Sequence, residues 1–300
     1  MVEVPRTAKD YSQEDLELVK AGCLTVATKL GGLMNDVVIV GGYVPTLLID
    51  MQQQPEESPD EWDAQDVVDR HIGTRDLDIG FSVGLLDEER YKEISKQLTQ
   101  AGFEPDTNKD DNETLQRWRF KQNPRLKIDF LIPPIEDGDE DRGGQPKHLE
   151  SNFAATITPG LQLAFEDSVT VEIDGQTLRG ADAIRNVRVC DLATFLVLKG
   201  LAIRLRGKDK DEYDIFYVLR NHSDVDPVVD TFADYVRREI PEAETALENL
   251  EEDFASADSV GPIAVSQFIY GSNDPDLQAD ANAFVLGFTT RVRQSLEQSA

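Results

Sequence analysis

The sequence predicts an α/β protein with a mixed-sheet lobe at residues 1–186 and a helical lobe at residues 187–300. Three observations predict this architecture. An apolar run at residues 37–40 ends in a Gly-Gly pair, as a buried strand entering a tight turn would. Later segments alternate charged and apolar residues with the period of a strand. Beyond residue 190 the apolar residues recur at helical spacing.

The elements of the first lobe are predicted from their capping and turn residues. Ser12 opens a helical pattern that weakens at Gly31-Gly32, and Pro45 suits the first turn of a helix behind the Gly41-Gly42 turn. Asp174-Gly175 is typical of a hairpin turn. Two acidic, proline-containing segments, 52–70 and 136–152, are predicted as a loop or short helix and as a loop, respectively. The predicted helices are 12–33, 44–51 and 87–101, and the predicted strands are 37–40, 74–79, 114–120, 126–132, 169–173 and 176–178.

The second lobe is predicted to be helical throughout. Asp191 is placed to cap its first helix, which Gly207 ends. Asp274 is predicted to cap the last helix of this lobe, and Pro275 to be its first helical residue. The predicted helices are 191–206, 213–221, 227–239, 243–254 and 275–296.

Three aspartates on two predicted strands indicate a metal site. Asp76 and Asp78 lie two residues apart, so their side chains share one strand face, roughly 6.6 Å apart along it. Asp129 presents a third carboxylate from the strand at 126–132, and neighbouring strands lie about 4.8 Å apart. If the two strands pair, the carboxylates can hold two Mg²⁺ ions, or Mn²⁺ in their place, for a phosphoryl displacement. The alternative is that each acid is merely solvated, since 58 of the 300 residues are acidic.

Three segments around these acids resemble the nucleotidyltransferase fold. They read Val40-Gly41-Gly42-Tyr43-Val44, Thr74-Arg75-Asp76-Leu77-Asp78-Ile79 and Lys127-Ile128-Asp129-Phe130-Leu131. That superfamily includes polymerase-beta-like enzymes, CCA-adding enzymes, antibiotic nucleotidyltransferases and the AbiEii/MenT toxins. Residues 198–204 and 207–215 are similar to the AbiEii-type pattern, with a helical lysine, an arginine, Lys-Asp and a later Asp-Ile. Where many members have Gly-Ser at the turn, Gly42 offers only its backbone N–H.

The resemblance implies an enzyme that transfers NMP from an NTP to an acceptor hydroxyl and releases pyrophosphate. It implies the 3′ end of tRNA or another RNA as the acceptor and a cognate antitoxin as a partner. A small-molecule acceptor, or a catalytically silent nucleotide-binding regulatory protein on the same fold, is the alternative. The implied catalytic and metal-binding residues are Asp76, Asp78 and Asp129, with Asp129 as general base. The nucleotide-binding residues are Gly41, Gly42, Tyr43, Thr74, Arg75, Lys199 and Lys208. Arg204, Asp209 and Asp214 are expected to contact the acceptor or support the site, and the basic residues Arg117 and Arg119 are candidates for the same role because of their charge.

Basic residues gather in two segments of this acidic chain. Residues 117–127 and 199–210 each carry five bases. Placed beside the carboxylates, they would attract a triphosphate or a nucleic-acid backbone. The alternative is that these bases pair with neighbouring acids. Trp118 could stack on a nucleotide base, but it could instead pack in a core. Lys199 could contact phosphate, or it could extend to the surface. His71 is interpreted as structural.

The composition indicates in which cellular environment the protein works. The formal net charge is −28, which disfavours general nucleic-acid binding and suits a halophilic cytoplasm, with an acidic protein of ordinary cytoplasm as the alternative. Two distant cysteines, Cys23 and Cys190, indicate buried thiols in a reducing compartment. No segment has the roughly 20 apolar residues of a membrane span, and the N-terminus lacks an apolar signal core, so we expect a cytoplasmic location and no membrane partner.

Overall fold

The computed structural model describes residues 5–50, 64–82, 88–207 and 209–298. The chain is a mixed α/β protein with an open mixed sheet and a C-terminal helical region, which confirms the predicted fold class. It forms two compact units. The sheet unit comprises Gln13–Val44 and Gly73–Asp191, and the helical unit comprises Met1–Ser12, Pro45–Ile72 and Leu192–Ala300. Two segments of the predicted first lobe, 1–12 and 45–72, are therefore grouped with the helical unit.

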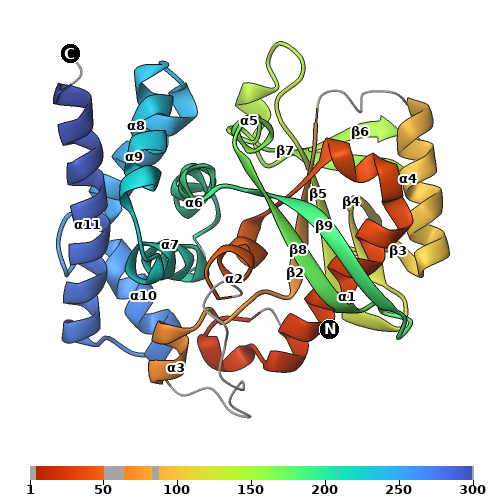
Figure 1. Ribbon diagram of the computed structural model, residues 1–300, viewed down its shortest axis with the longest axis horizontal. Coiled ribbons are helices and arrows are strands. Elements are labelled where there is room, and N and C mark those ends of the chain that lie inside the picture. Colours follow the sequence, from red (N-terminus) through yellow and green to blue (C-terminus); the bar gives the residue numbers. More distant parts are fainter. Residues whose placement is uncertain (1–4, 51–63, 83–87, 208, 299–300) are drawn as a thin grey trace. The chain divides into compact units, whose positions relative to one another are not determined.

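The sheet unit is built on one nine-stranded sheet (Figure 1). Its main path runs β3-β4-β5-β2-β1-β9-β8, with β7 paired to β5 and β6 paired to β7. β2 is antiparallel to β1 but parallel to β5, so the sheet is mixed. The strands are β1 (Val37–Val40), β2 (Asp76–Phe81), β3 (Phe103–Thr107), β4 (Glu113–Phe120), β5 (Asn123–Ile132), β6 (Pro146–Glu150), β7 (Phe153–Ile157), β8 (Ser168–Gln176) and β9 (Asp182–Cys190).

Alternation along the central strands gives the sheet one apolar face and one charged face. In β2, Leu77 and Ile79 are fully buried while Asp76 and Asp78 are partly exposed. β5 follows the same pattern, with buried Ile128 and Phe130 flanking a partly exposed aspartate. The apolar face carries an aromatic cluster formed by Phe81, Tyr91, Trp118, Phe130 and Phe153. This cluster confirms the interpretation of the tryptophan as a core residue.

Helices cover the apolar face of the sheet and fill its connections. α1 contacts β5, β8 and β9, and α4 packs beside β3 and β6, as Figure 1 shows. The packing is close, because a β-carbon on Gly22 of α1 would lie 2.9 Å from the Leu126 side chain of β5. The helical elements of the sheet unit are α1 (Gln13–Leu30), η2 (Gly31–Asp36), η3 (Gly41–Tyr43), α4 (Glu88–Ala101), η6 (Glu140–Arg142) and α5 (Leu163–Glu166).

The helical unit packs around α7, which is buried along most of its length. α7 contacts α6, α10 and α11, and the C-terminal helix α11 also contacts α8 and α9 (Figure 1). Aromatic contacts join these helices, including Tyr213 with Phe268 and Phe232 with Phe288. The unit contains η1 (Ala8–Asp10), α2 (Val44–Leu48), α3 (Ala64–Asp69), α6 (Leu192–Arg206), α7 (Asp209–Asn221), α8 (Asp226–Arg237), α9 (Pro241–Asp253), α10 (Val260–Tyr270) and α11 (Pro275–Gln298).

The predicted helix ends agree well with the structure. α6 ends one residue before Gly207, which has a left-handed φ of 54°. The backbone N–H of Leu277 donates to the Asp274 carboxylate, 2.9 Å away, so Asp274 caps α11 as predicted. None of the helices in the described ranges is both long enough and apolar enough to cross a bilayer.

The hairpin predicted at Asp174-Gly175 is wrong. β8 continues through both residues, which pair with Ile184 and Ala183 of β9. The chain reverses instead over residues 177–181, where the Thr177 N–H donates to Ala181 and Gly180 has a φ of 75°. The reason is that β9 supplies a partner for the whole of β8, and nine paired residues outweigh a local turn preference.

Several elements lie outside the sequence predictions. The patterns do not predict β3, β6, β7, β9, α5 or α10, and β6 lies inside the segment 136–152 that is predicted as a loop. β3 and β6 are polar and contain proline, so they lack the strict alternation of polar and apolar residues that predicts a strand. Of the segment 52–70, residues 64–69 form α3, residue 70 follows it, and residues 52–63 lie outside the described part of the chain.

Candidate functional site

The predicted strand pairing brings two of the three aspartates opposite each other. β2 and β5 run parallel, with Asp78 opposite Asp129 and Asp76 opposite Lys127. All three aspartates lie on the charged face of the sheet. The Asp76 side chain is 36% exposed and that of Asp129 is 16% exposed, so both remain within reach of solvent.

Gly41 makes room for the Asp78 carboxylate. Gly41 opens the turn after β1 with a φ of 71°, a conformation that side chains other than glycine's rarely adopt. A β-carbon at this position would lie 1.9 Å from Oδ2 of Asp78 and 2.7 Å from its carboxyl carbon. The carboxylate therefore occupies the space that glycine leaves free, directly beside the backbone of the turn.

Arg117 neutralises part of this acidic group. It lies on β4 opposite Asp129, and its Nε and Nη2 atoms donate to the two Asp129 carboxylate oxygens at 2.6 and 2.5 Å. Its Nη2 is also 4.0 Å from Oδ2 of Asp76. The bond to Asp129 raises the pKa of Arg117 further above its ordinary value, so the guanidinium is permanently charged.

Carboxylates aligned by strand register beside a glycine turn are the type of ligand that a hard divalent cation takes. In the ranges that the structure describes, however, no three or more His, Cys, Asp or Glu side chains are gathered closely enough to hold a metal ion. The Asp129 carboxylate faces Arg117 instead. For Asp129 to act as a ligand, the guanidinium must move.

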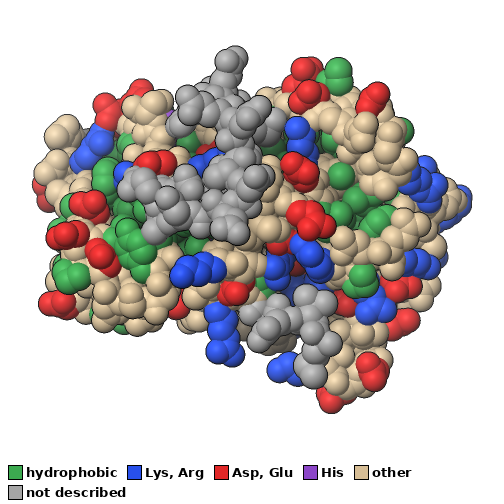
Figure 2. Space-filling model, turned by 90° about the horizontal axis from the view of Figure 1, so that it is seen from below, with side chains coloured by type: hydrophobic (Ala, Val, Ile, Leu, Met, Phe, Trp, Pro, Cys, Tyr) green, Lys and Arg blue, Asp and Glu red, His purple; other side chains and the backbone are tan. Residues whose placement is uncertain are grey.

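The other bases of the segment 117–127 also pair with acids, which is the alternative to a role in binding phosphate. Arg119 contacts Glu104 and Asp106, and Lys127 lies 2.7 Å from Asp106. Arg125 pairs with Asp15, and Lys121 with Glu104. Figure 2 shows the same mixing, with basic and acidic side chains next to one another over the visible face.

Three predicted nucleotide-binding residues near the carboxylates have structural partners. The Tyr43 ring is buried, at 1% exposure, so its backbone rather than its ring borders the turn. Thr74 donates its hydroxyl to the Asp76 carbonyl at 3.1 Å and accepts from the Asp76 N–H, which fixes the start of β2. Nε of Arg75 donates to Asp15 at 3.0 Å, and this ion pair attaches the start of β2 to α1.

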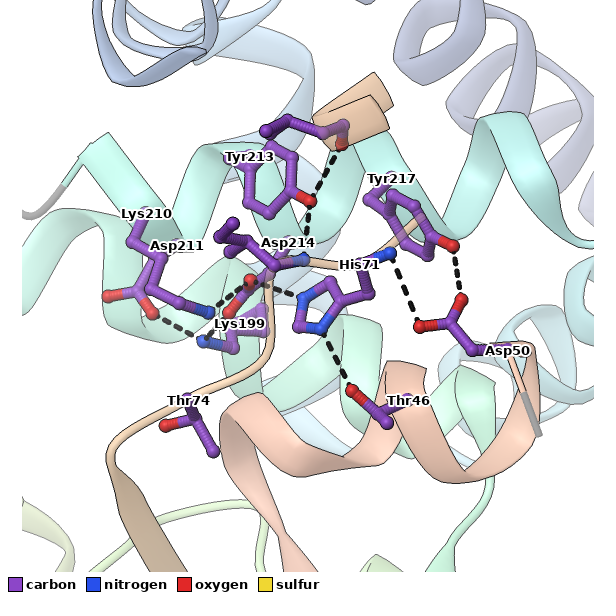
Figure 3. A network of polar contacts seen from close by, with 12 residues as sticks. Thr46, Asp50, His71, Thr74, Lys199, Lys210, Asp211, Tyr213, Asp214 and Tyr217 are labelled. Carbon is purple, nitrogen blue, oxygen red and sulfur yellow. Dashed lines mark hydrogen bonds and ion pairs between the residues drawn. The ribbon is translucent and has the colours of Figure 1, made fainter. Parts of the chain in front are cut away.

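A second group of predicted residues forms a buried charged network in the helical unit (Figure 3). The Lys199 ammonium of α6 lies 2.5 Å from Oδ1 of Asp211 and 2.6 Å from Oδ2 of Asp214, both on α7. Lys210 adds a second positive charge, 2.6 Å from Oδ1 of Asp214. Lys199 is 8% exposed, so it does not extend to the surface. Two lysines and two aspartates thus balance each other away from water.

His71 completes this network as a neutral side chain. Burial lowers the pKa of His71 to about 4, although its hydrogen bond to Asp214 opposes the shift. Burial alone would raise the pKa of Asp214, but Lys199 and Lys210 hold it well below its usual range. The ionised Asp214 can only accept, so Nε2 of His71 donates to it at 2.9 Å and Nδ1 accepts from the Thr46 hydroxyl at 3.2 Å. The structural interpretation of His71 agrees with these contacts.

Further polar contacts fix the chain on either side of His71. The Tyr213 hydroxyl donates to the Val67 carbonyl at 2.9 Å and accepts from the Ile72 N–H at 3.1 Å. Asp50 accepts from the His71 N–H and from the Tyr217 hydroxyl (Figure 3). The residues that precede β2 are therefore held by side chains of α7.

The remaining predicted site residues lie apart from this network or outside the described residues. Arg204 pairs with Glu252 and Asp253 of α9, at 2.6 and 2.9 Å. Asp209 begins α7, and burial raises its pKa. Lys208 lies outside the described residues.

The sequence interpretation misses Lys210, Asp211 and Thr46 as parts of the network. The available signal is the charged segment 208–214, in which Lys210 and Asp214 are four residues apart on one helix face. That spacing is common on solvated helices. Only the burial of α7 shows that the charges need each other.

Glu212, beside this network, should make stability depend on pH. It is 3% exposed, one of its carboxylate oxygens has no partner among the described residues, and burial raises its pKa from 4.5 to about 8. Between these two values the folded protein holds a proton that the unfolded chain has lost. Its stabilising contribution is complete below pH 4.5 and is lost as pH rises through about 8, at about 1.4 kcal/mol per pH unit.

We therefore expect the free energy of unfolding to fall by about 2 kcal/mol between pH 6.5 and 8, and Glu212→Gln to abolish that fall. The low folded pKa of His71 adds a slope of opposite sign near pH 6.5, where the histidine of the unfolded chain is half protonated. That slope is common to the parent and Glu212→Gln, so it cancels in the difference between their pH profiles. Urea unfolding at several pH values measures the slope, with exposed Glu248→Gln as the control. Parallel pH profiles for the parent and Glu212→Gln would show that Glu212 is not the titrating group.

No protein-family model matches this chain, and no curated protein matches it either.

Proposed function

We propose that this protein is a divalent-cation-dependent nucleotidyltransferase. The observation that carries the proposal is the position of the Asp78 carboxylate, which lies against Gly41 of the turn and opposite Asp129 across the β2–β5 pair. Carboxylates beside the backbone N–H groups of a glycine turn suit a cation that carries a polyphosphate. The resemblance of these segments to the nucleotidyltransferase fold supports the same chemistry.

The carboxylates have distinct roles in the proposed reaction. Asp76, Asp78 and Asp129 would hold Mg²⁺ or Mn²⁺, which neutralises charge on the triphosphate and on the attacking and leaving oxygens. The acceptor oxygen forms a bond to the α-phosphorus as the bond from that phosphorus to pyrophosphate breaks. Asp129 takes the proton of the acceptor hydroxyl. The backbone N–H groups of Gly41, which is partly exposed, and of Gly42, which is buried, would donate to phosphate oxygens.

Lys199 and Lys208 are the proposed cations for the triphosphate. Asp211 and Asp214 occupy two of the three N–H donors of Lys199 and fix the direction of its ammonium group. The aspartates therefore act as positioning residues for Lys199. The assignment of Lys199 to the triphosphate rests on the resemblance of residues 198–204 to the AbiEii-type pattern.

A small-molecule acceptor is the second candidate beside an RNA acceptor such as the 3′ end of tRNA. The observation that favours it is the pairing of all five bases in the segment 117–127 with acids, which reduces the positive charge available to a nucleic-acid backbone. The RNA acceptor, a toxin role and an antitoxin partner rest on the resemblance alone. Buried, unpaired Cys23 and Cys190 suit a reducing cytoplasm, where NTPs are available.

Asp78→Asn should abolish transfer and leave the fold intact, because it removes one metal-binding charge and almost no volume. We expect at least a 100-fold loss of label transfer from α-labelled NTPs, within the range for lost electrostatic stabilisation. The assay offers total RNA and a small-molecule extract as separate acceptors, with circular dichroism as the fold check. Asp174→Asn, a carboxylate exposed to 75% on β8, is the matched control.

Equal transfer by the parent and Asp78→Asn would remove Asp78 from the mechanism. Binding of NTP by the parent without any transfer, to either acceptor, would instead favour the silent nucleotide-binding protein. Transfer to RNA alone or to the extract alone decides between the two acceptor classes.

A further inference from the structure

Arg117 occupies both oxygens of the carboxylate that the proposed reaction needs. Its guanidinium donates to Oδ1 and Oδ2 of Asp129 at 2.6 and 2.5 Å, and lies 4.0 Å from Asp76. Its strand position explains this geometry, because Arg117 and Asp129 are direct partners across β4 and β5. Such a bidentate contact is among the strong pairings that a carboxylate forms with a side chain.

We propose that Arg117 is a built-in counter-cation that competes with the divalent cation for Asp129. In the cation-free protein it holds Asp129, and a cation that takes Asp129 as a ligand displaces the guanidinium. Arg117 thereby sets the cation affinity of the site. The proposal rests on the proposed function, since it requires Asp129 to be a ligand.

The charges on this face of the sheet support the assignment. Asp76, Asp78 and Asp129 lie on two adjacent strands and repel one another unless a positive charge lies between them. Arg119 and Lys127 lie on the same face but are held by Glu104 and Asp106 of β3. Of these three bases, Arg117 is the one that contacts Asp129 and lies near Asp76, and its charge does not vary over the physiological pH range.

The competition also accounts for the absence of a closed cluster of metal-ligating side chains in the described ranges. A carboxylate whose two oxygens both accept from one guanidinium points toward that guanidinium. Release of Arg117 would let Asp129 turn toward Asp78, its neighbour on β2. The cation site would thus form only as Arg117 leaves.

Binding of Mn²⁺ alone, without nucleotide, tests the proposal. Electron paramagnetic resonance of free Mn²⁺ gives the affinity, and 1 M KCl shortens the screening length to about 3 Å, which suppresses weak binding elsewhere on this acidic chain. We expect Arg117→Gln to bind Mn²⁺ about tenfold more tightly than the parent, because a repelling charge and a competitor are both removed. Arg119→Gln removes the same charge from the same strand and should bind like the parent.

Two further variants separate the possible outcomes. Asp129→Asn should bind Mn²⁺ more weakly than the parent. If it does, but Arg117→Gln binds no more tightly than the parent, then the competition is overturned and the metal site stands. If Asp129→Asn has no effect, Asp129 is not a ligand, and both this proposal and the metal site of the proposed function fail. Should Arg117→Gln not fold, Arg117→Lys, which cannot bridge both oxygens, takes its place and must still bind Mn²⁺ more tightly than the parent.

Discussion

Replacing Lys199 with methionine should lower the free energy of unfolding by about 3–5 kcal/mol, because it leaves a buried carboxylate without its counter-charge. Lys199 is 8% exposed and lies within 2.6 Å of both Asp211 and Asp214. Asp214 would keep Lys210 and His71, so Asp211 is the group that loses its ion pair. Methionine retains most of the side-chain volume, and the loss therefore reports charge rather than a cavity.

Urea unfolding followed by circular dichroism measures this effect without adding salt to an acidic protein. Lys20→Met is the matched control, because Lys20 is 37% exposed and lies 3.8 Å from an exposed carboxylate, that of Asp174. Such a surface pair contributes about 1 kcal/mol or less. If Lys199→Met costs no more than Lys20→Met, the network in Figure 3 does not hold α6 and α7 together through charge.

Gly41→Ala should disable the carboxylate site while leaving the rest of the fold in place. Alanine in a left-handed conformation costs roughly 1–2 kcal/mol. Its β-carbon would also lie 1.9 Å from Oδ2 of Asp78, so the carboxylate must turn away. Because a displacement of about 1 Å can cost a hundredfold in rate, we expect transfer to fall at least 100-fold and Mn²⁺ binding to weaken.

Gly31→Ala separates the clash from the backbone strain. Gly31 also has a positive φ, 54°, but no atom lies within 4 Å of the position that its β-carbon would take. Gly31→Ala should lose only the stability that the backbone strain costs, and only Gly41→Ala should lose Mn²⁺ affinity. Equal Mn²⁺ affinity in the two variants would show that the contact between Gly41 and Asp78 is not needed for the site.

The strands that carry the aspartates could be predicted because their sequence pattern is local. β2 and β5 each alternate aspartate with buried aliphatic or aromatic residues, and alternation fixes the side of the sheet on which each side chain lies. The pairing of Asp78 with Asp129 was a condition of the predicted site, and the register of β2 and β5 meets it. The signals at Asp274 and Gly207 are equally local: Asp274 caps the start of α11, and α6 ends just before Gly207, as predicted.

The partners of the charged residues could not be predicted, since they come from distant parts of the chain. The contact between Arg117 and Asp129 depends on the register across the β4–β5 hairpin, and the position of Arg119 depends on β3, which the patterns do not predict. His71 and Asp214 are 143 residues apart, and nothing local indicates that they meet. The hairpin error has the same origin, because β9 lies beyond the turn that Asp174-Gly175 predicts.

The fate of two labels on one nucleotide tests the central claim most directly. The protein is incubated with Mg²⁺, acceptor and an NTP labelled either at the α-phosphorus or at the γ-phosphorus. A nucleotidyltransferase is expected to place the α-label on the acceptor, only when Mg²⁺ is present, and to release the γ-label as pyrophosphate. Transfer of the γ-label to the acceptor, or its release as inorganic phosphate without any transfer of the α-label, would contradict the proposed function.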